Sequence, residues 1–368
     1  RGHEVTVFTR GRTPQPFGDR VRAVVGDRDP RVAPGLAAVE HGAWDAAIDT
    51  SGYVPRVVGA SATLLAPRVG RYVFVSSLSV IAKPDRPGLD ESAPVAVLDD
   101  PATEDVLPHY GGLKAACEAV VRDACGDRAT IVRPGLIVGP YDATDRFGYW
   151  VARFVHPRLL GDRAPRAVVP APRERPVQFV EARDLAAWLV DLCERDAGGT
   201  FNACSPAGEW TMGDLVDACI AASAGPPVSA WVDEKTLLDF HVEPWTGLPL
   251  WIPSTDADAA GFMSVDCDRA HAAGLRTRPL DDTVRDTAAW LAARDNAGAW
   301  QHVLSASREQ LLLSAIDPGV KVILCSGLID DAVREGARAA GIHAMLDKPF
   351  DAETLIRTLD DILARNNQ

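Results

Sequence analysis

Short apolar segments that alternate with longer helical ones place the strongest constraint on the fold of this chain. The segments with the composition of buried strands are residues 4–9, 21–25, 46–49, 72–76 and 129–132. Stretches of helical composition, such as residues 57–65 and 110–125, lie between them. Strands that alternate with helices are typical of a parallel sheet with helices on both faces. The sequence therefore predicts an α/β fold.

Length and charge limit the classes of function. At 368 residues the chain exceeds one typical core, so we expect two or three domains. The net charge of −13 argues against nucleic acid or an anionic membrane surface as a partner. No apolar run reaches the roughly 18 residues of a membrane span, and no signal peptide is visible.

The cysteines and acidic residues indicate no metal. The seven cysteines are widely spaced and form no C-x-x-C pair, which argues against a zinc site and a disulfide framework. Asp142, Asp145 and Asp184 do not form a convincing metal set. Free thiols suit a reducing compartment. We therefore expect a cytoplasmic protein that acts on a small-molecule substrate without a metal.

The second half of the chain indicates further divisions. Helices are predicted over residues 184–195, 211–222 (with Thr211 as N-cap) and 281–293, after an irregular stretch over residues 139–175. Asp-Asn-Ala-Gly at residues 295–298 predicts a linker. The α/β pattern then restarts, with strands at residues 321–325 and 343–346 and helices at residues 330–340 and 352–364. The predicted domains are residues 1–293, a linker over 294–307 and a small separate piece over 308–368.

Tyr110 and Lys114 form a Tyr-x-x-x-Lys pair, which on a helix places both side chains on one face. A free tyrosine has a pKa of about 10 and exchanges protons poorly at neutral pH. A neighbouring lysine favours the phenolate and lowers that pKa, which would make Tyr110 a general acid or base. Ser77 ends an apolar strand, at the edge where α/β sheets bind their ligands, and its hydroxyl would hold the substrate oxygen.

Such a pair alone is more often part of a surface helix with a solvated lysine. Here an apolar strand that ends in Ser76 and Ser77 precedes the pair, and a strand followed by Arg133-Pro134-Gly135 comes after it. This order of elements favours the catalytic interpretation.

These residues carry a resemblance to a known family. The run at residues 72–80 (Tyr-Val-Phe-Val-Ser-Ser-Leu-Ser-Val), the tyrosine–lysine pair and the run at residues 131–140 (Ile-Val-Arg-Pro-Gly-Leu-Ile-Val-Gly-Pro) resemble the extended short-chain dehydrogenase/reductases. More narrowly, they resemble the NAD-dependent epimerase/dehydratase group. The resemblance spans about residues 1–293. It implies a Rossmann-type parallel sheet that binds NAD(P), with a small substrate lobe mostly within residues 140–280.

The resemblance also implies an activity. Ser77, Tyr110 and Lys114 match the family's catalytic triad, and Lys114 inherits the family's bond to the nicotinamide ribose. The implied function is that of an NAD(P)-dependent oxidoreductase, epimerase or reductase, with Tyr110 as acid or base during hydride transfer. Nucleotide sugars are typical substrates of the group, and its pairing through helices like residues 110–125 implies a homodimer. The alternative is a non-catalytic cofactor-binding or signalling protein.

Further cofactor contacts follow from the family's pattern. Asp27 matches an acidic residue that meets the adenine, and the chain after the third strand (Thr50, Ser51 and Gly52) matches a segment beside the cofactor. Arg133, Pro134 and Gly135 match the segment at the nicotinamide end. Arg10 follows the first strand, where an arginine meets the 2′-phosphate of NADP. This favours NADP over NAD, unless Arg10 is a solvated loop residue; Gly52 and Gly135 also suit simple turns.

The chain departs from the family at its beginning. The family's glycine-rich phosphate loop belongs to a strand–turn–helix that would precede Arg1, and we expect the natural beginning to lie ahead of this residue. Gly111-Gly112 and Gly198-Gly199 are not in a strand-to-helix context. Because backbone amides of that loop hold the pyrophosphate, their absence would weaken cofactor binding.

The C-terminal piece carries a second resemblance. The runs at residues 320–327 and 341–350 resemble the second half of a response-regulator receiver domain, which implies a short flavodoxin-like βαβα piece. Ser326 matches that family's switch hydroxyl and Lys348 its phosphoryl-contacting lysine, yet no acidic pair precedes them, so we expect a leftover scaffold rather than phosphorelay activity. Under the non-catalytic alternative this tail is an interaction module. It would either dock on the sheet edge and supply a strand, or be a loosely attached fusion.

Overall fold

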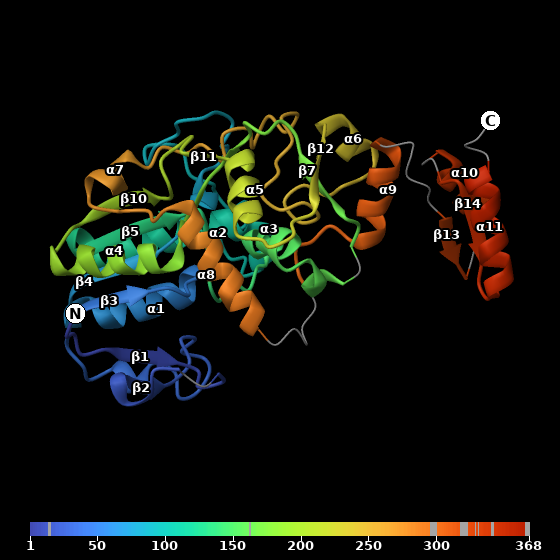
Figure 1. Cartoon of the computed structure of the whole chain (residues 1–368). Coiled ribbons are helices and arrows are strands. Elements are labelled where there is room, and N and C mark those ends of the chain that lie inside the picture. Colours follow the sequence, from blue (N-terminus) through green and yellow to red (C-terminus); the bar gives the residue numbers. More distant parts are fainter. Residues whose placement is uncertain are drawn as a thin grey trace. The chain divides into compact units, whose positions relative to one another are not determined.

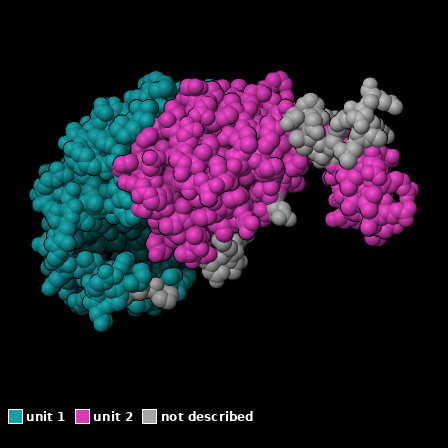
Figure 2. All heavy atoms as spheres, in the orientation of Figure 1, with its two compact units in different colours: residues 1–138, 176–209, 256–278 teal, residues 139–175, 210–255, 279–368 magenta. Residues whose placement is uncertain are grey.

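The computed structural model describes residues 1–13, 16–161, 163–294, 300–316, 323–327, 329, 331–339 and 342–364. These residues form two compact units (Figure 2). Unit 1 comprises residues 1–138, 176–209 and 256–278, and unit 2 comprises residues 139–175, 210–255 and 279–368. The domain boundaries predicted from the sequence stay predictions.

A four-stranded parallel sheet forms the centre of unit 1 (Figure 1). Its order is β10-β5-β4-β3, and its strands are β3 (Trp44–Asp49), β4 (Val69–Val75), β5 (Ala129–Pro134) and β10 (Gly199–Ala203). Every neighbouring pair is parallel. The parallel α/β sheet predicted from the alternating pattern is thereby confirmed.

Side chains alternate between the two faces of this sheet because successive residues of a strand point in opposite directions. Tyr72 and Phe74 of β4 pack under α1 (Pro55–Leu65) and α2 (Val106–Cys125). Val73 and Val75 pack on the other face, against α4 (Ala182–Glu194). β4 is apolar almost throughout because both of its faces are covered.

The first two strands form a sheet of their own within unit 1. β1 (Thr6–Thr9) and β2 (Arg22–Val25) pair in parallel with each other, drawn in dark blue in Figure 1. The same unit holds β6 (Leu136–Val138) paired with β9 (Phe179–Glu181). It also holds β8 (Pro176–Val177) and α7 (Asp268–Ala272).

Unit 2 is built from three helices that pack on one another and a two-stranded parallel sheet. The helices are α3 (Arg146–Val155), α5 (Met212–Ala221) and α8 (Leu280–Ala293), and the strands are β7 (Arg166–Pro170) and β12 (Val228–Val232). Thr211, in β11 (Trp210–Thr211), caps α5, as the sequence predicted, and the structure adds a capping box with Asp214. α6 (Glu234–Asp239) follows β12.

A buried ion pair joins the next helix to this unit. α9 (Ala306–Ile316) packs against β7. The carboxylate of Glu309 accepts a hydrogen bond from Nε of Arg153 at 3.0 Å and lies 3.4 Å from Nη1 of Arg163. The main-chain amide of Val168 in β7 donates to the same carboxylate at 3.3 Å. The side chains of Glu309 and Arg153 are both only 1% exposed.

The C-terminal elements are β13 (Ile323–Ser326), α10 (Asp331–Ala339), β14 (Ala344–Asp347) and α11 (Ala352–Ala364). The two strands pair in parallel. The predicted linker at 295–298, and the predicted strand and helix positions 321, 322, 330 and 340, lie outside the described residues. The receiver-like and flavodoxin-like assignments, and the docking of this tail on the sheet, stay predictions.

Neither a membrane-spanning helix nor a metal-type cluster of side chains occurs in the described residues. None of the described helices is both long and apolar enough to cross a bilayer. Within the same residues, no group of three or more His, Cys, Asp or Glu side chains is placed to hold a metal ion.

Candidate functional site

Ser77 lies just beyond the carboxyl end of β4. Its hydroxyl oxygen already accepts one hydrogen bond. Ser77 is the N-cap of a short 3-10 turn, Leu78–Val80, and its Oγ accepts a hydrogen bond from the amide of Ser79 at 3.1 Å. A serine hydroxyl has one further acceptor direction and one donor hydrogen. Its hydrogen also meets the Tyr110 phenol, with which Ser77 forms a hydrogen bond, so a substrate oxygen that binds beside that phenol lies within reach of the same hydroxyl.

Tyr110 and Lys114 lie in the first regular turns of α2. The backbone of His109 is non-helical (φ −117°, ψ 19°), so the unbroken helix begins at Tyr110. Lys114 follows four residues later and lies on the same face of the helix, as its spacing predicted. Tyr110 is partly buried and its ring centroid lies 6.4 Å from that of Tyr53.

Two glycines bring α2 close to neighbouring chain, Gly111 to the turn that follows Ser77 and Gly112 to Leu98. A Cβ on Gly111 would lie 2.2 Å from the main-chain oxygen of Ser79. A Cβ on Gly112 would lie 2.6 Å from Cδ2 of Leu98. Sequence reasoning missed this role, although two glycines inside a helical pattern are a signal: each costs roughly 1 kcal/mol relative to alanine and calls for a packing reason.

Lys114 is buried and held by main-chain carbonyls. Its side chain is 2% exposed, and its Nζ donates to the carbonyl oxygens of Gly52 at 2.7 Å and Val75 at 2.8 Å. Nζ also lies 4.3 Å from the ring centroid of Phe74. Burial lowers the pKa of Lys114 to about 8. An ammonium group has three hydrogens, so Lys114 keeps one for a ligand.

The pKa of Tyr110 moves in the opposite direction to our expectation. Burial raises it, and the hydrogen bond with Ser77 offsets only part of that rise. The expected lowering of this pKa by Lys114 is wrong for the protein alone, because the lysine ammonium is directed at the carbonyls of Gly52 and Val75. Tyr110 is therefore protonated at neutral pH.

The structure brings part of the predicted cofactor segment to this site. Thr50 and Ser51 are exposed at the carboxyl end of β3, and Gly52 beside them is buried and accepts from Lys114. The amide of Ser51 donates to the Asp49 carboxylate at 3.3 Å. The segment thus lies next to Lys114, while its role as a cofactor contact stays a prediction.

Other predicted residues are engaged within the protein. The guanidinium of Arg133 is buried and donates to both carboxylate oxygens of Glu118, at 2.8 and 2.7 Å. Pro134 ends β5, and the amide of Gly135 donates to Ala203 at 3.4 Å. Asp27 accepts from the amide of Asp29 at 2.9 Å, while Arg10 is exposed after β1. These contacts do not test the five residues Arg133, Pro134, Gly135, Asp27 and Arg10 as cofactor contacts, which stay predictions.

Sequence reasoning also missed the polar contacts at the carboxyl end of β3 and the role of Glu118 in α2. Arg28 donates to both carboxylate oxygens of Asp49 and to Ser61, and the Tyr72 hydroxyl donates to Asp49 at 2.8 Å. This network ties the chain after β2 to the carboxyl end of β3. Glu118 had a usable signal, since it falls four residues after Lys114 and therefore on the same helix face.

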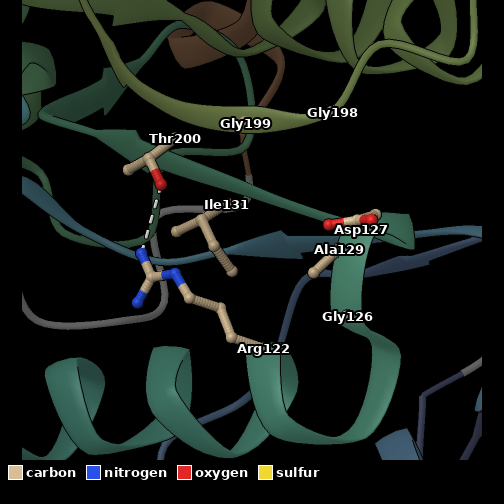
Figure 3. A pocket seen from close by; sticks show the side chains of 8 residues that line it. All are labelled: Arg122, Gly126, Asp127, Ala129, Ile131, Gly198, Gly199 and Thr200. Carbon is tan, nitrogen blue, oxygen red and sulfur yellow. Dashed lines mark hydrogen bonds between the residues drawn. The ribbon is translucent and has the colours of Figure 1, made fainter.

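A shallow cavity of about 300 Å³ lies elsewhere in unit 1 (Figure 3). It is lined at the amino ends of β5 and β10 by Arg122, Gly126, Asp127, Ala129, Ile131, Gly198, Gly199 and Thr200. Arg122 donates across it to Thr200 at 3.1 Å. Parallel α/β sheets bind their ligands at the carboxyl ends of the strands, so we place the candidate site at Ser77, Tyr110 and Lys114 instead.

Comparison with known proteins identifies the fold. No protein-family model and no curated protein matches this chain. UDP-glucuronic acid 4-epimerase from Bacillus cereus, in complex with NAD, aligns over 79% of this chain and 91% of its own, with a TM-score of 0.54 and 12% identity. TunA, an NAD-dependent NDP-hexosamine 5,6-dehydratase involved in tunicamycin biosynthesis, aligns over 81% and 92%, with a TM-score of 0.53 and 19% identity.

A third solved structure, MoeE5 in complex with UDP-glucose and NAD, covers 79% of this chain and 91% of its own, with a TM-score of 0.50 and 14% identity. At such identities the likeness shows the fold alone. The chain has the Rossmann-like α/β fold of NAD-dependent epimerases and dehydratases, as the sequence predicted.

Proposed function

We propose that this protein is an NAD(P)-dependent oxidoreductase or epimerase in which Tyr110 exchanges a proton with the substrate. The observation that carries the proposal is the convergence of Ser77, Tyr110 and Lys114 at the carboxyl edge of the sheet, with Lys114 buried and fixed by two carbonyls. A buried lysine with one ammonium hydrogen left over, next to an exposed strand end, is suited to bind a ligand rather than to be solvated.

The residues at this edge suit the nicotinamide ribose end of a dinucleotide. The remaining hydrogen of Lys114 and the exposed polar side chains of Thr50 and Ser51 are donors and acceptors for ribose hydroxyls. When bound, a nicotinamide dinucleotide supplies or accepts the hydride. We include NADP in the proposal because Arg10 is exposed after β1, where a 2′-phosphate would meet it.

The proton moves through Tyr110. In the reducing direction, the carbonyl carbon of the substrate gains the hydride and its oxygen gains the Tyr110 proton, so a carbonyl becomes an alcohol. Ser77 donates a hydrogen bond to the same oxygen and holds it beside the phenol. Because burial raises the pKa of Tyr110, the phenol carries this proton at neutral pH.

The substrate class extends the proposal. The similar solved structures include MoeE5, described in complex with UDP-glucose and NAD, so we propose a nucleotide sugar as the substrate. A cytoplasmic location and a homodimer belong to the same proposal.

Replacing Tyr110 by phenylalanine tests the proposed function. We expect turnover of nucleotide sugars with NADH or NADPH to fall at least 100-fold, as for loss of a general acid, while cofactor binding is retained. Tyr149→Phe is the matched control, since its buried hydroxyl has no hydrogen-bond partner in the described structure. Full activity in Tyr110→Phe would contradict this mechanism.

A further inference from the structure

Tyr53 is an exposed aromatic side chain at the candidate site. It follows Gly52 at the carboxyl end of β3 and is 47% exposed. Its ring centroid lies 6.4 Å from that of Tyr110, with an angle of 43° between the two rings. Nζ of Lys114 lies 5.6 Å from the same centroid. Both distances are those of direct neighbours, so Tyr53 adjoins two of the three candidate catalytic residues.

The backbone on both sides of Tyr53 is fixed. The carbonyl of Gly52 accepts from Lys114, and a Cβ on Gly52 would lie 2.5 Å from Cε2 of Phe74, so the main chain there lies directly on the core. Val54 is the N-cap of α1, and its carbonyl accepts the first main-chain hydrogen bonds of that helix. An exposed ring on a fixed backbone loses little conformational entropy when it binds a ligand.

Single exposed aromatic side chains are common on protein surfaces and need no explanation by themselves. Tyr141 in unit 2 is such a case, since it is 85% exposed and its ring pairs with Trp290 at 5.9 Å. Tyr53 differs because it is electrostatically linked to the candidate proton donor. Burial is the largest cause of the raised pKa of Tyr110, and the phenol of Tyr53 adds to it.

The order of groups along the site indicates which part of a ligand meets Tyr53. In the chain Tyr53 follows Thr50 and Ser51, the proposed contacts of the ribose. In space its ring lies beside Lys114, the third of these contacts, and beside Tyr110, which gives the proton. Hydride transfer requires the nicotinamide ring to lie next to the substrate carbon whose oxygen meets that proton. The ring between the ribose and the reacting carbon therefore passes close to Tyr53.

We propose that the ring of Tyr53 packs against the nicotinamide ring of the bound dinucleotide. The inference rests on the proposed function, because it takes a dinucleotide as the ligand of this site. Contact between two flat rings uses the aromatic faces and edges, so the ring of Tyr53 provides it and the hydroxyl does not. Tyr53 is thus a binding residue for the cofactor and takes no part in the proton transfer by Tyr110.

Two ligands that differ in the nicotinamide ring test this contact. Calorimetry of the full chain compares NADH with ADP-ribose, or NADPH with 2′-phospho-ADP-ribose if the wild type binds NADPH more tightly. We expect Tyr53→Leu to weaken the dinucleotide about five- to tenfold, the usual contribution of an aromatic pair, and to leave the ligand without nicotinamide unchanged. Tyr53→Phe keeps the ring and is expected to bind both ligands as the wild type does.

Two control variants separate a ring contact from general damage to the site. Lys114→Met removes the proposed ribose contact and should weaken both ligands together. Tyr141→Leu removes an exposed tyrosine of unit 2 and should weaken neither. The melting temperature of each variant checks that it is folded. Equal loss of both ligands in Tyr53→Leu, wild-type affinity for the dinucleotide in that variant, or no dinucleotide binding by the wild type would overturn the proposal.

Turnover keeps this proposal distinguishable from the proposed function. If Tyr53→Leu selectively weakens the dinucleotide but the wild type turns over no nucleotide sugar, the proposed function fails while the ring contact stands. If the wild type is active and Tyr53→Leu binds both ligands as the wild type does, the ring contact fails while the proposed function stands.

Discussion

Replacing Glu309 by alanine is expected to lower the free energy of unfolding by about 3–5 kcal/mol, as measured by urea unfolding. The reason is the buried guanidinium of Arg153, which is 1% exposed and loses its carboxylate partner in this variant. Arg163 loses its counterion as well. Loss of one member of a buried ion pair leaves an uncompensated charge, which costs far more than the pair itself contributes.

Asp239→Ala is the control for Glu309. Asp239 pairs with Lys235 on the exposed surface of α6, with side chains 56% and 83% exposed. Pairs of this kind contribute about 0–1 kcal/mol, so the control should barely change stability. An equally small effect in both variants would show that α9 is not held on β7 by Glu309.

Replacing Gly111 by alanine is expected to reduce turnover by roughly 100-fold, the effect of a misplacement of about 1 Å at a catalytic group. The new Cβ would lie 2.2 Å from the main-chain oxygen of Ser79, so the backbone of α2 or of the turn after Ser77 has to move. Either movement separates Tyr110 from Ser77. Steady-state kinetics with the best nucleotide sugar measures the loss.

Gly59→Ala separates this effect from helix propensity. Gly59 lies inside α1 of the same unit, and a Cβ there would make an ordinary contact at 3.7 Å with Val120. We expect this variant to gain up to about 1 kcal/mol of stability and to keep its turnover. If Gly111→Ala behaves like Gly59→Ala, the close approach of α2 to Ser79 is not needed for catalysis.

The central sheet and the positions of the candidate catalytic residues within it could be predicted because their signals are local. The alternation of apolar and helical segments predicts parallel strands, and the structure confirms the sheet. The four-residue spacing of Tyr110 and Lys114 predicts one shared helix face, and an apolar strand that ends at Ser77 predicts the edge of the sheet. Each of these inferences uses the sequence of one helix or strand, or of two that follow each other in the chain.

The remaining features depend on contacts between residues distant in sequence. Nothing around Arg133 shows that its guanidinium pairs with Glu118, which belongs to a different element. Glu309 meets Arg153 across more than a hundred residues of chain. The raised pKa of Tyr110 depends on how deeply the phenol is buried, which composition and spacing do not reveal.

Titration calorimetry of the full chain with NADPH and NADH in parallel tests the central claim most directly. We predict that at least one of them binds in the micromolar range, and that Lys114→Met, which removes the free ammonium hydrogen, weakens this binding at least tenfold. Tighter binding of NADPH would support Arg10 as the contact for the 2′-phosphate. No binding at millimolar cofactor would contradict the account, because Ser77, Tyr110 and Lys114 would then meet no nicotinamide.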